Sequence, residues 1–167
     1  MSPRDTLARV IEIWALCGGA LLLLIVAATA LNAGGFAANM LARIWGGSVP
    51  GLSGYEDGVT LLIGVAALAM FPYAQLHGSH AAVDVFMQMA PGWANRGVTL
   101  LSGVLVAALA LGMAVMLSFG ALELRGDAVE TAVLGWPVWI FALPAIPSSV
   151  LWALAALAEI FTGTEDF

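Results

Sequence analysis

The chain has 167 residues, of which 62% are hydrophobic and 10% are charged. Soluble domains carry about 25% charged residues, so this composition indicates a membrane protein without a separate soluble domain. Eleven acids against five arginines, with no lysine, give a net charge of −6. Such a chain has no basic run to neutralise phosphates, which excludes a nucleic-acid partner.

Four stretches are long enough to cross a bilayer and contain no Asp, Glu, Lys, Arg or His: residues 13–31, 58–76, 97–122 and 131–158. A membrane-spanning helix needs about 20 mostly apolar residues. We therefore predict an all-α polytopic protein that forms one domain over residues 1–167, with transmembrane helices at approximately 12–33, 57–77, 96–122 and 134–160. Ion-coupled carriers usually keep an ionisable group near mid-membrane, so spans without charge favour a subunit that builds a complex.

The first helix does not have to stop where its charge-free stretch ends. Asn32, Asn39 and Arg43 follow at spacings of seven and four, which places them on one face of a continuing helix. We predict a long, tilted first helix whose far end leaves the lipid. Gly34 and Gly35 could introduce a kink into it.

The beginning of the chain allows a second interpretation. Arg4 and Arg9 before an apolar stretch, with small residues at 28–30, imitate a cleavable secretory signal. The stretch runs on without a break before those small residues, so we expect the helix to be retained. Within it, Trp14 suits an interfacial anchor, and Cys17, which has no partner thiol, is expected to be a small core residue.

The connection after the second span carries a polar stripe. His80, Asp84 and Gln88 are four residues apart, which predicts a short amphipathic helix at residues 80–92 that lies along the membrane surface. His77 and His80 are the only histidines. A haem held by two histidines needs them on facing helices, so no cofactor and no metal is expected.

The third and fourth spans contain residues with packing consequences. Small residues at spacings near four allow close helix contacts in lipid, and the third span has Gly103, Ala107, Ala108 and Gly112. In the fourth span, Pro137 is expected to mark a helix start. Pro144 and Pro147 remove backbone donors inside the membrane and imply a kink.

The arginines set the predicted orientation. With four spans, both termini and the middle connection share one side, which carries Arg4, Arg9 and Arg96. The opposite side carries Arg43 and Arg125. By the positive-inside rule, this bias of three to two predicts that both termini are cytoplasmic.

Two charged groups are candidates for specific contacts. Glu12 lies one helical turn after Arg9 and is expected to pair with it at the interface rather than to bind a substrate. Arg43 and Glu56 come near the same membrane face, and a guanidinium can bind a carboxylate through two hydrogen bonds. We therefore expect either an Arg43–Glu56 ion pair across the first hairpin or two solvated loop charges.

Several short motifs occur in a fixed order along the chain. They are Asn39-x-x-x-Arg43, Glu56-Asp57 at the opening of a span, His80-x-x-Val83-Asp84, and Leu134-Gly135-Trp136-Pro137-Val138-Trp139. With the four-span layout, this set resembles the DctQ-type small permease subunit of tripartite ATP-independent periplasmic (TRAP) transporters. The resemblance covers roughly residues 37–157. One departure is Gly54-Tyr55, where Trp-Ser is more usual.

The resemblance implies partners rather than an enzymatic activity. A large sodium-coupled permease subunit would carry the solute, and a periplasmic solute-binding protein would deliver an organic acid to the bacterial inner membrane. The small subunit would enlarge the static scaffold and help to dock the binding protein through loops 46–55 and 123–130. The residues expected to have structural or interface roles, none of them catalytic, are Asn39, Arg43, Glu56, His80, Asp84, Pro137 and Trp139.

Two other classes of protein are alternatives to this interpretation. A self-sufficient homodimeric transporter or channel would need a polar site near mid-membrane, for which Glu12 is a weak candidate. A membrane-bound enzyme or electron-transfer anchor would need a nucleophile with its base, a haem pair or a metal cluster, and the sequence offers none of these.

Overall fold

The computed structural model describes residues 3–49, 51–77 and 92–162. Within these ranges the fold is helical, and four segments are long and apolar enough to cross a membrane: Arg4–Trp45, Tyr55–Leu76, Arg96–Gly126 and Trp139–Ile160. This confirms the prediction of an all-α polytopic protein. The amphipathic helix expected at residues 80–92, with His80, Asp84 and Gln88, lies outside the described residues except for Gly92, which begins α4. The elements are α1 (Pro3–Ala42), η1 (Arg43–Trp45), α2 (Tyr55–Leu76), α4 (Gly92–Gly126), α5 (Trp139–Ala142) and α6 (Ala145–Thr162).

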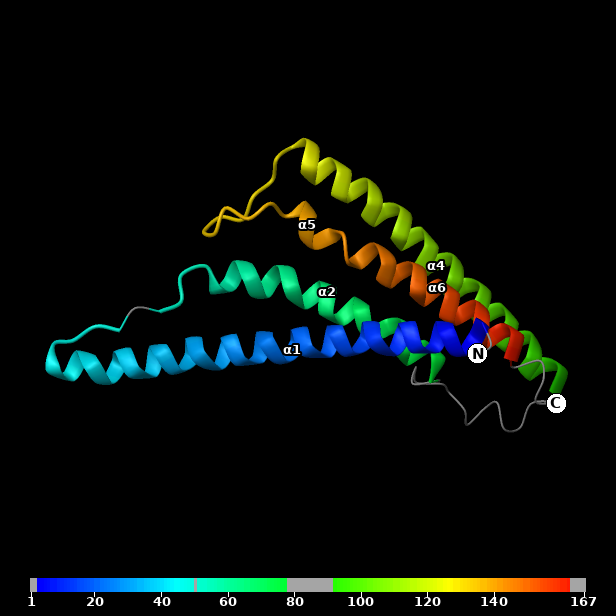
Figure 1. The fold of residues 1–167 in the computed structure, drawn as a ribbon, viewed down its shortest axis with the longest axis horizontal. Coiled ribbons are helices and arrows are strands. Elements are labelled where there is room, and N and C mark those ends of the chain that lie inside the picture. The colour runs from blue at the N-terminus through cyan, green and yellow to red at the C-terminus, as the bar shows by residue number, and fades with distance from the viewer. Residues whose placement is uncertain (1–2, 50, 78–91, 163–167) are drawn as a thin grey trace.

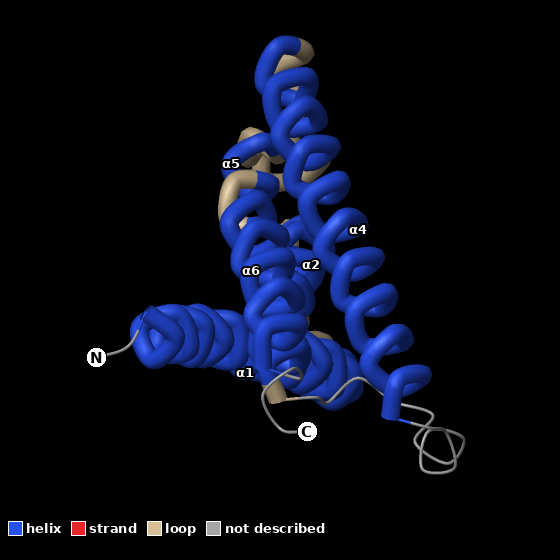
Figure 2. The backbone as a smooth tube through the Cα atoms, turned by 90° about the vertical axis from the view of Figure 1, so that its right-hand side faces the viewer, coloured by secondary structure: helices blue, strands red, loops and turns tan. Residues whose placement is uncertain are grey.

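The helices form two layers that diverge from one end of the molecule. The first layer is α1 with α2, and the second is α6 with α4; α2 packs on α6 and joins the layers. Both layers converge where α1 begins and α6 ends, and they separate toward the opposite end (Figure 1). Viewed from that converging end, α1 crosses obliquely below α6 and α4 (Figure 2).

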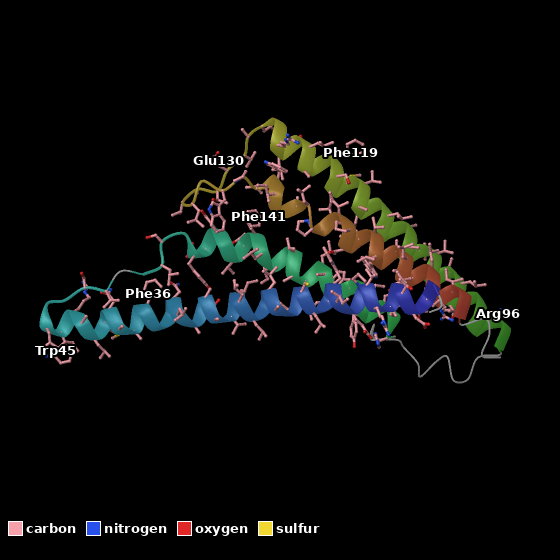
Figure 3. All side chains as sticks on the ribbon, in the orientation of Figure 1. Phe36, Trp45, Arg96, Phe119, Glu130 and Phe141 are labelled. Carbon is pink, nitrogen blue, oxygen red and sulfur yellow. The ribbon has the colours of Figure 1, made fainter. Side chains whose placement is uncertain are left out.

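Helix α1 is much longer than a bilayer is thick. Its 40 residues correspond to about 60 Å, against roughly 30 Å of hydrocarbon. The helix runs through Gly34 and Gly35 without a break. Its last turns and η1 extend well past the start of α2, and Trp45 lies at the tip (Figure 3). This confirms the predicted long first helix.

Small residues bring α1 close to α2. Ile11, Ala15 and Gly18 are buried at spacings of four and three along α1, the pattern of helices that cross at a shallow angle. A Cβ atom added to Gly18 would lie 2.9 Å from the Ala69 Cβ. Cys17 lies beside this seam but is exposed, so the prediction that it is a core residue is wrong.

Helix α6 is the central helix of the fold. One face carries Ser148 and Trp152 toward α1 and α2. The adjacent face packs on α4, where Ala153 and Trp152 form a buried cluster with Ala110. Gly103 of α4 lies directly against the Ile160 side chain. Small residues of the third span therefore serve packing within the chain, as at Gly103 and Ala107, whereas Ala108 and Gly112 are exposed.

The fourth span begins later than its apolar sequence suggested. Residues 129–138 form a hairpin-like loop, in which Thr131 N donates to Trp136 O at 2.9 Å and Val138 N donates to Val129 O at 3.0 Å. The helical part starts at Trp139, two residues after Pro137. Gly135 has a φ of +63°, a left-handed conformation that glycine adopts in turns and that does not continue an α-helix.

Two prolines explain the break between α5 and α6. In a continuous helix, Pro144 and Pro147 would donate to the carbonyls of Ile140 and Leu143, but proline has no N–H group. Leu143 N donates to Ile140 O at 3.4 Å instead, and Ile146 N donates to Leu143 O at 3.3 Å. The predicted kink is therefore present, and each carbonyl retains a donor, as lipid requires.

Candidate functional site

The two loops at the diverging end are held together by one carboxylate. Asp57 lies in the first turn of α2, where the helix dipole favours an acid. Its Oδ2 atom accepts hydrogen bonds from Val133 N at 2.8 Å and from Leu134 N at 3.1 Å. We call this contact the latch. It ties the start of α2 to the 129–138 loop, 76 residues away in sequence.

A glycine allows the two loops to approach closely at the latch. Gly54 precedes α2 with a φ of +78°, a conformation that residues with a side chain rarely adopt. A Cβ atom there would lie 2.4 Å from a methyl group of Leu134. This chain has Gly54-Tyr55 where the motif that it resembles more usually has Trp-Ser, so the motif did not predict this close contact.

The first loop returns along the extension of α1. Val49 N donates to Asn39 Oδ1 at 3.0 Å, and the Tyr55 hydroxyl donates to Thr29 Oγ1 at 2.8 Å. The loop therefore runs antiparallel to α1 from Asn39 back to Thr29. Asn39 was predicted to have a structural or interface role, and it bonds to this loop; the role itself stays a prediction.

The ion pair expected between Arg43 and Glu56 is not formed within the described part of the chain. Helix α2 begins beside Thr29, and Arg43 lies 14 residues further along α1, which is about 21 Å of helical rise. Both charged side chains are exposed. The acid that makes the contact between loops is Asp57, the neighbour of the one we had selected.

Trp139 and Arg125 meet at the end of the second layer. The Arg125 guanidinium lies 5.1 Å from the centre of a Trp139 ring, within the range of a cation–π contact. Trp136 stacks on Phe141 with ring centres 5.8 Å apart. These contacts fasten α4 and the 129–138 loop to α5, which places Trp139 in a contact between helices.

A notch lies between the α1 extension and the latched loops. It consists of two adjoining hollows. The first, of about 290 Å³, has Asn32, Ser53, Glu56 and Asp57 among its lining residues. The second, of about 280 Å³, is almost wholly apolar, with Leu24, Leu62 and Trp136 in its walls. Residues 52–55 line both hollows.

The latch gives a direct prediction. Replacing Asp57 with alanine removes the acceptor for two backbone N–H groups, so residues 129–138 should open more often. We expect their amides to exchange with deuterium on the order of tenfold faster, measured by mass spectrometry of the protein in nanodiscs. Glu56→Ala, which removes the neighbouring carboxylate, is the control; equal exchange in both variants would contradict the latch.

Inside the bundle, polar side chains bond to one another across helices. The Trp14 indole, expected to be an interfacial anchor, donates to Ser148 Oγ at 2.8 Å. Trp152 Nε1 donates to Gln75 Oε1 at 3.1 Å, and Gln75 Nε2 donates to Glu159 at 2.5 Å. These bonds join α6 to α1 and α2. Sequence reasoning had not selected Gln75, Ser148 or Trp152.

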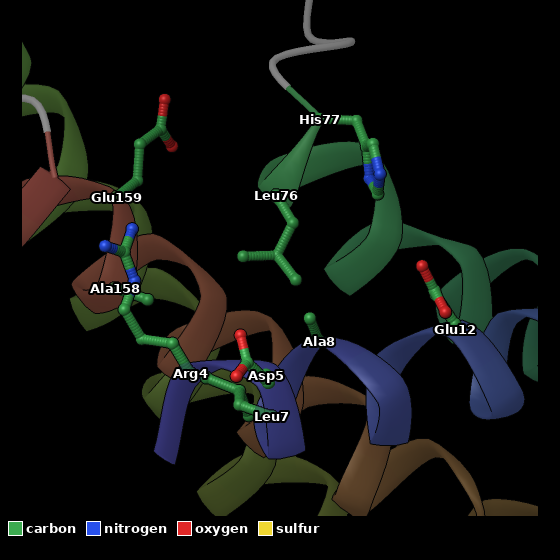
Figure 4. A pocket seen from close by; sticks show the side chains of 9 residues that line it. All are labelled: Arg4, Asp5, Leu7, Ala8, Glu12, Leu76, His77, Ala158 and Glu159. Carbon is green, nitrogen blue, oxygen red and sulfur yellow. The ribbon is translucent and has the colours of Figure 1, made fainter. Parts of the chain in front are cut away.

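A second pocket, of about 310 Å³, lies where α1 begins and α2 and α6 end. Its ionisable lining residues, labelled in Figure 4, are Arg4, Asp5, Glu12, His77 and Glu159. Glu12 and Arg9 are both exposed, and no ion pair joins them among the described residues, so that prediction is wrong. The His77 ring stacks on Tyr73, with centres 4.1 Å apart.

In the ranges that the structure describes, no group of three or more His, Cys, Asp or Glu side chains could hold a metal ion. The side-chain contacts described above run between helices and between loops.

Comparison with known proteins identifies a family for the chain. Searches of the curated proteins and of the solved structures found no match. A family model described as "Tripartite ATP-independent periplasmic transporters, DctQ component" matches residues 34–166. This range begins in the extension of α1 and includes both loops of the latch. The chain therefore belongs to the DctQ family and is a multi-pass membrane component of a tripartite ATP-independent periplasmic transporter.

Proposed function

We propose that this chain is a scaffold and docking subunit for organic-acid uptake. It would enlarge the static part of a large sodium-coupled permease subunit and help to seat a periplasmic solute-binding protein. Both termini would be cytoplasmic, in the bacterial inner membrane, so the latch and the notch would face the periplasm. The chain would contribute no catalytic residue.

The observation that supports scaffolding best is the placement of charge. In α2, α4 and α6 the described charged side chains lie within five residues of a helix end: Glu56, Asp57, Arg96, Glu123, Arg125 and Glu159. A carrier that binds sodium needs oxygen ligands inside the protein. The buried polar side chains among the described residues are Gln75, Ser148 and Ser149. Gln75 is already bonded to Trp152 and Glu159, and the two serine hydroxyls donate to backbone carbonyls four residues earlier, so we assign them structural roles.

The outer surfaces of α1 and α4 also favour contact with a partner protein. Large apolar side chains along both helices are exposed, among them Leu23, Met40, Val104 and Met116. In lipid, such faces can meet acyl chains or another membrane protein. In η1, which follows α1, Ile44 and Trp45 are 71% and 81% exposed. Because α1 is longer than a bilayer is thick, these side chains would lie outside the lipid, which favours their burial against a larger neighbouring protein.

Reconstitution tests this proposal. Purified chain alone in liposomes should leave a ²²Na⁺ gradient undissipated. The large subunit with the chain should take up the organic acid that co-purifies with the binding protein, and omission of the chain should reduce that uptake at least about tenfold. Saturable uptake by the chain alone would instead support the homodimeric transporter.

A further inference from the structure

We propose that the notch receives a lysine or arginine side chain of the solute-binding protein, with Glu56 as the carboxylate that binds it. This inference rests on the proposed docking function and specifies the chemistry of the contact. The notch is formed by α1, the loop over residues 51–54, the start of α2 and the 129–138 loop.

The polar hollow of the notch suits both parts of a basic side chain. Lysine and arginine have an apolar stem and a charged head, and they bury the stem along apolar surface. The lining of this hollow includes the apolar residues Phe36, Leu52 and Val133. It also includes Asn32, Ser53 and Glu56, which offer oxygen atoms. A stem along the apolar residues would therefore place its head beside these oxygen atoms.

Glu56 is the carboxylate left for a partner. Asp57 lines the same hollow, but its Oδ2 atom already accepts two backbone hydrogen bonds. Glu56 is exposed, and among the residues that the structure describes none bonds to its carboxylate. The start of α2 carries partial positive charge, which opposes a cation. Recognition of a basic head therefore depends on the negative charge of Glu56 being present.

The surrounding charge favours the same partner. The segments 43–57 and 123–130 carry five acids and two arginines. Arg125 lies over Trp139, and Arg43 begins η1 and does not line the notch. The net negative field would attract a basic surface and speed its approach, an effect that salt weakens.

The test compares two carboxylates at this end of the molecule. Nanodiscs contain the large subunit with wild-type chain, Glu56→Gln, or the matched control Glu123→Gln, whose exposed carboxylate lies outside the notch. The probe is the fluorescently labelled solute-binding protein, titrated at about 50 and 300 mM salt. We expect Glu56→Gln to raise Kd about tenfold at low salt and much less at high salt. Glu123→Gln removes the same charge from the field without a contact in the notch and should raise Kd less than about threefold.

The outcomes separate this inference from the proposed function. If uptake requires the chain but Glu56→Gln binds like Glu123→Gln, docking stands and the basic side chain is wrong. If Glu56→Gln instead loses the large subunit during purification, the notch faces that subunit and the inference is overturned. A salt-independent loss of binding would contradict a charged contact. A photocrosslinker at Ser53, which lines both hollows, should capture a lysine- or arginine-containing peptide of the binding protein.

Discussion

Replacement of Gly18 by leucine should separate α1 from α2 and strongly destabilise the bundle. A Cβ atom at this position would lie 2.9 Å from the Ala69 Cβ and 3.1 Å from the Ala66 carbonyl oxygen. Neither atom is the end of a flexible side chain, so the helix axes must move apart. Overpacking of this kind costs about 1–3 kcal/mol or more, and the shift should also stretch the Trp14–Ser148 bond.

The neighbouring glycine provides the control for this prediction. An added Cβ at Gly19 would meet nothing within 4 Å. Gly19→Leu therefore makes the same substitution as Gly18→Leu without forcing the helices apart. Unfolding in mixed micelles of detergent and SDS should give a clearly lower free energy for Gly18→Leu and a value within about 0.5 kcal/mol of wild type for Gly19→Leu. Equal effects of the two substitutions would show that α1 does not pack on α2 at Gly18.

Helix positions were predictable because lipid leaves a chain few choices. Backbone polar groups must be satisfied internally, so long apolar runs specify helices almost by themselves. Continuation of the first helix was also predictable, since Asn32, Asn39 and Arg43 keep a helical spacing. The exception was the start of the fourth span, where the uncharged residues 131–138 form a loop stabilised by Asp57, a contact that apolarity does not reveal.

Contacts between loops were harder to predict than the spans. Glu56 and Asp57 are adjacent acids, and only the geometry of the 129–138 loop decides which one bonds to it. The Arg43–Glu56 ion pair is not formed because α1 extends past the start of α2, which places Arg43 far from Glu56. Such contacts depend on where each helix begins relative to its neighbours, and one sequence does not fix that relation.

Gln75 was missed for a different reason. Ionisable residues stand out in an apolar sequence as candidate functional groups. A neutral amide near the end of a span has no charge and no periodic pattern to mark it. Its importance arises from a partner 77 residues away and from its burial, which leaves it 8% exposed. Buried amides in a helix that is otherwise apolar are therefore worth testing, even when no charge accompanies them.

Substitution of Gln75 by leucine is expected to leave the Trp152 indole N–H without its acceptor inside the bundle. Trp152 is only 8% exposed, so water cannot readily replace the amide. Leaving a buried donor unpaired costs about 1–3 kcal/mol, and Glu159 loses one donor in addition. The free energy of unfolding in mixed micelles should fall by that amount.

A double-mutant cycle distinguishes this bond from simple packing. Trp152→Phe removes the donor while keeping an aromatic ring near Phe71, whose ring centre lies 5.1 Å from that of Trp152. If the bond links α2 to α6, Gln75→Leu should cost less in the Trp152→Phe background than in the wild type. The difference should approach the upper end of values for side-chain bonds in bilayers, about 1.7 kcal/mol. Strict additivity of the two substitutions would mean that the amide and the indole act independently.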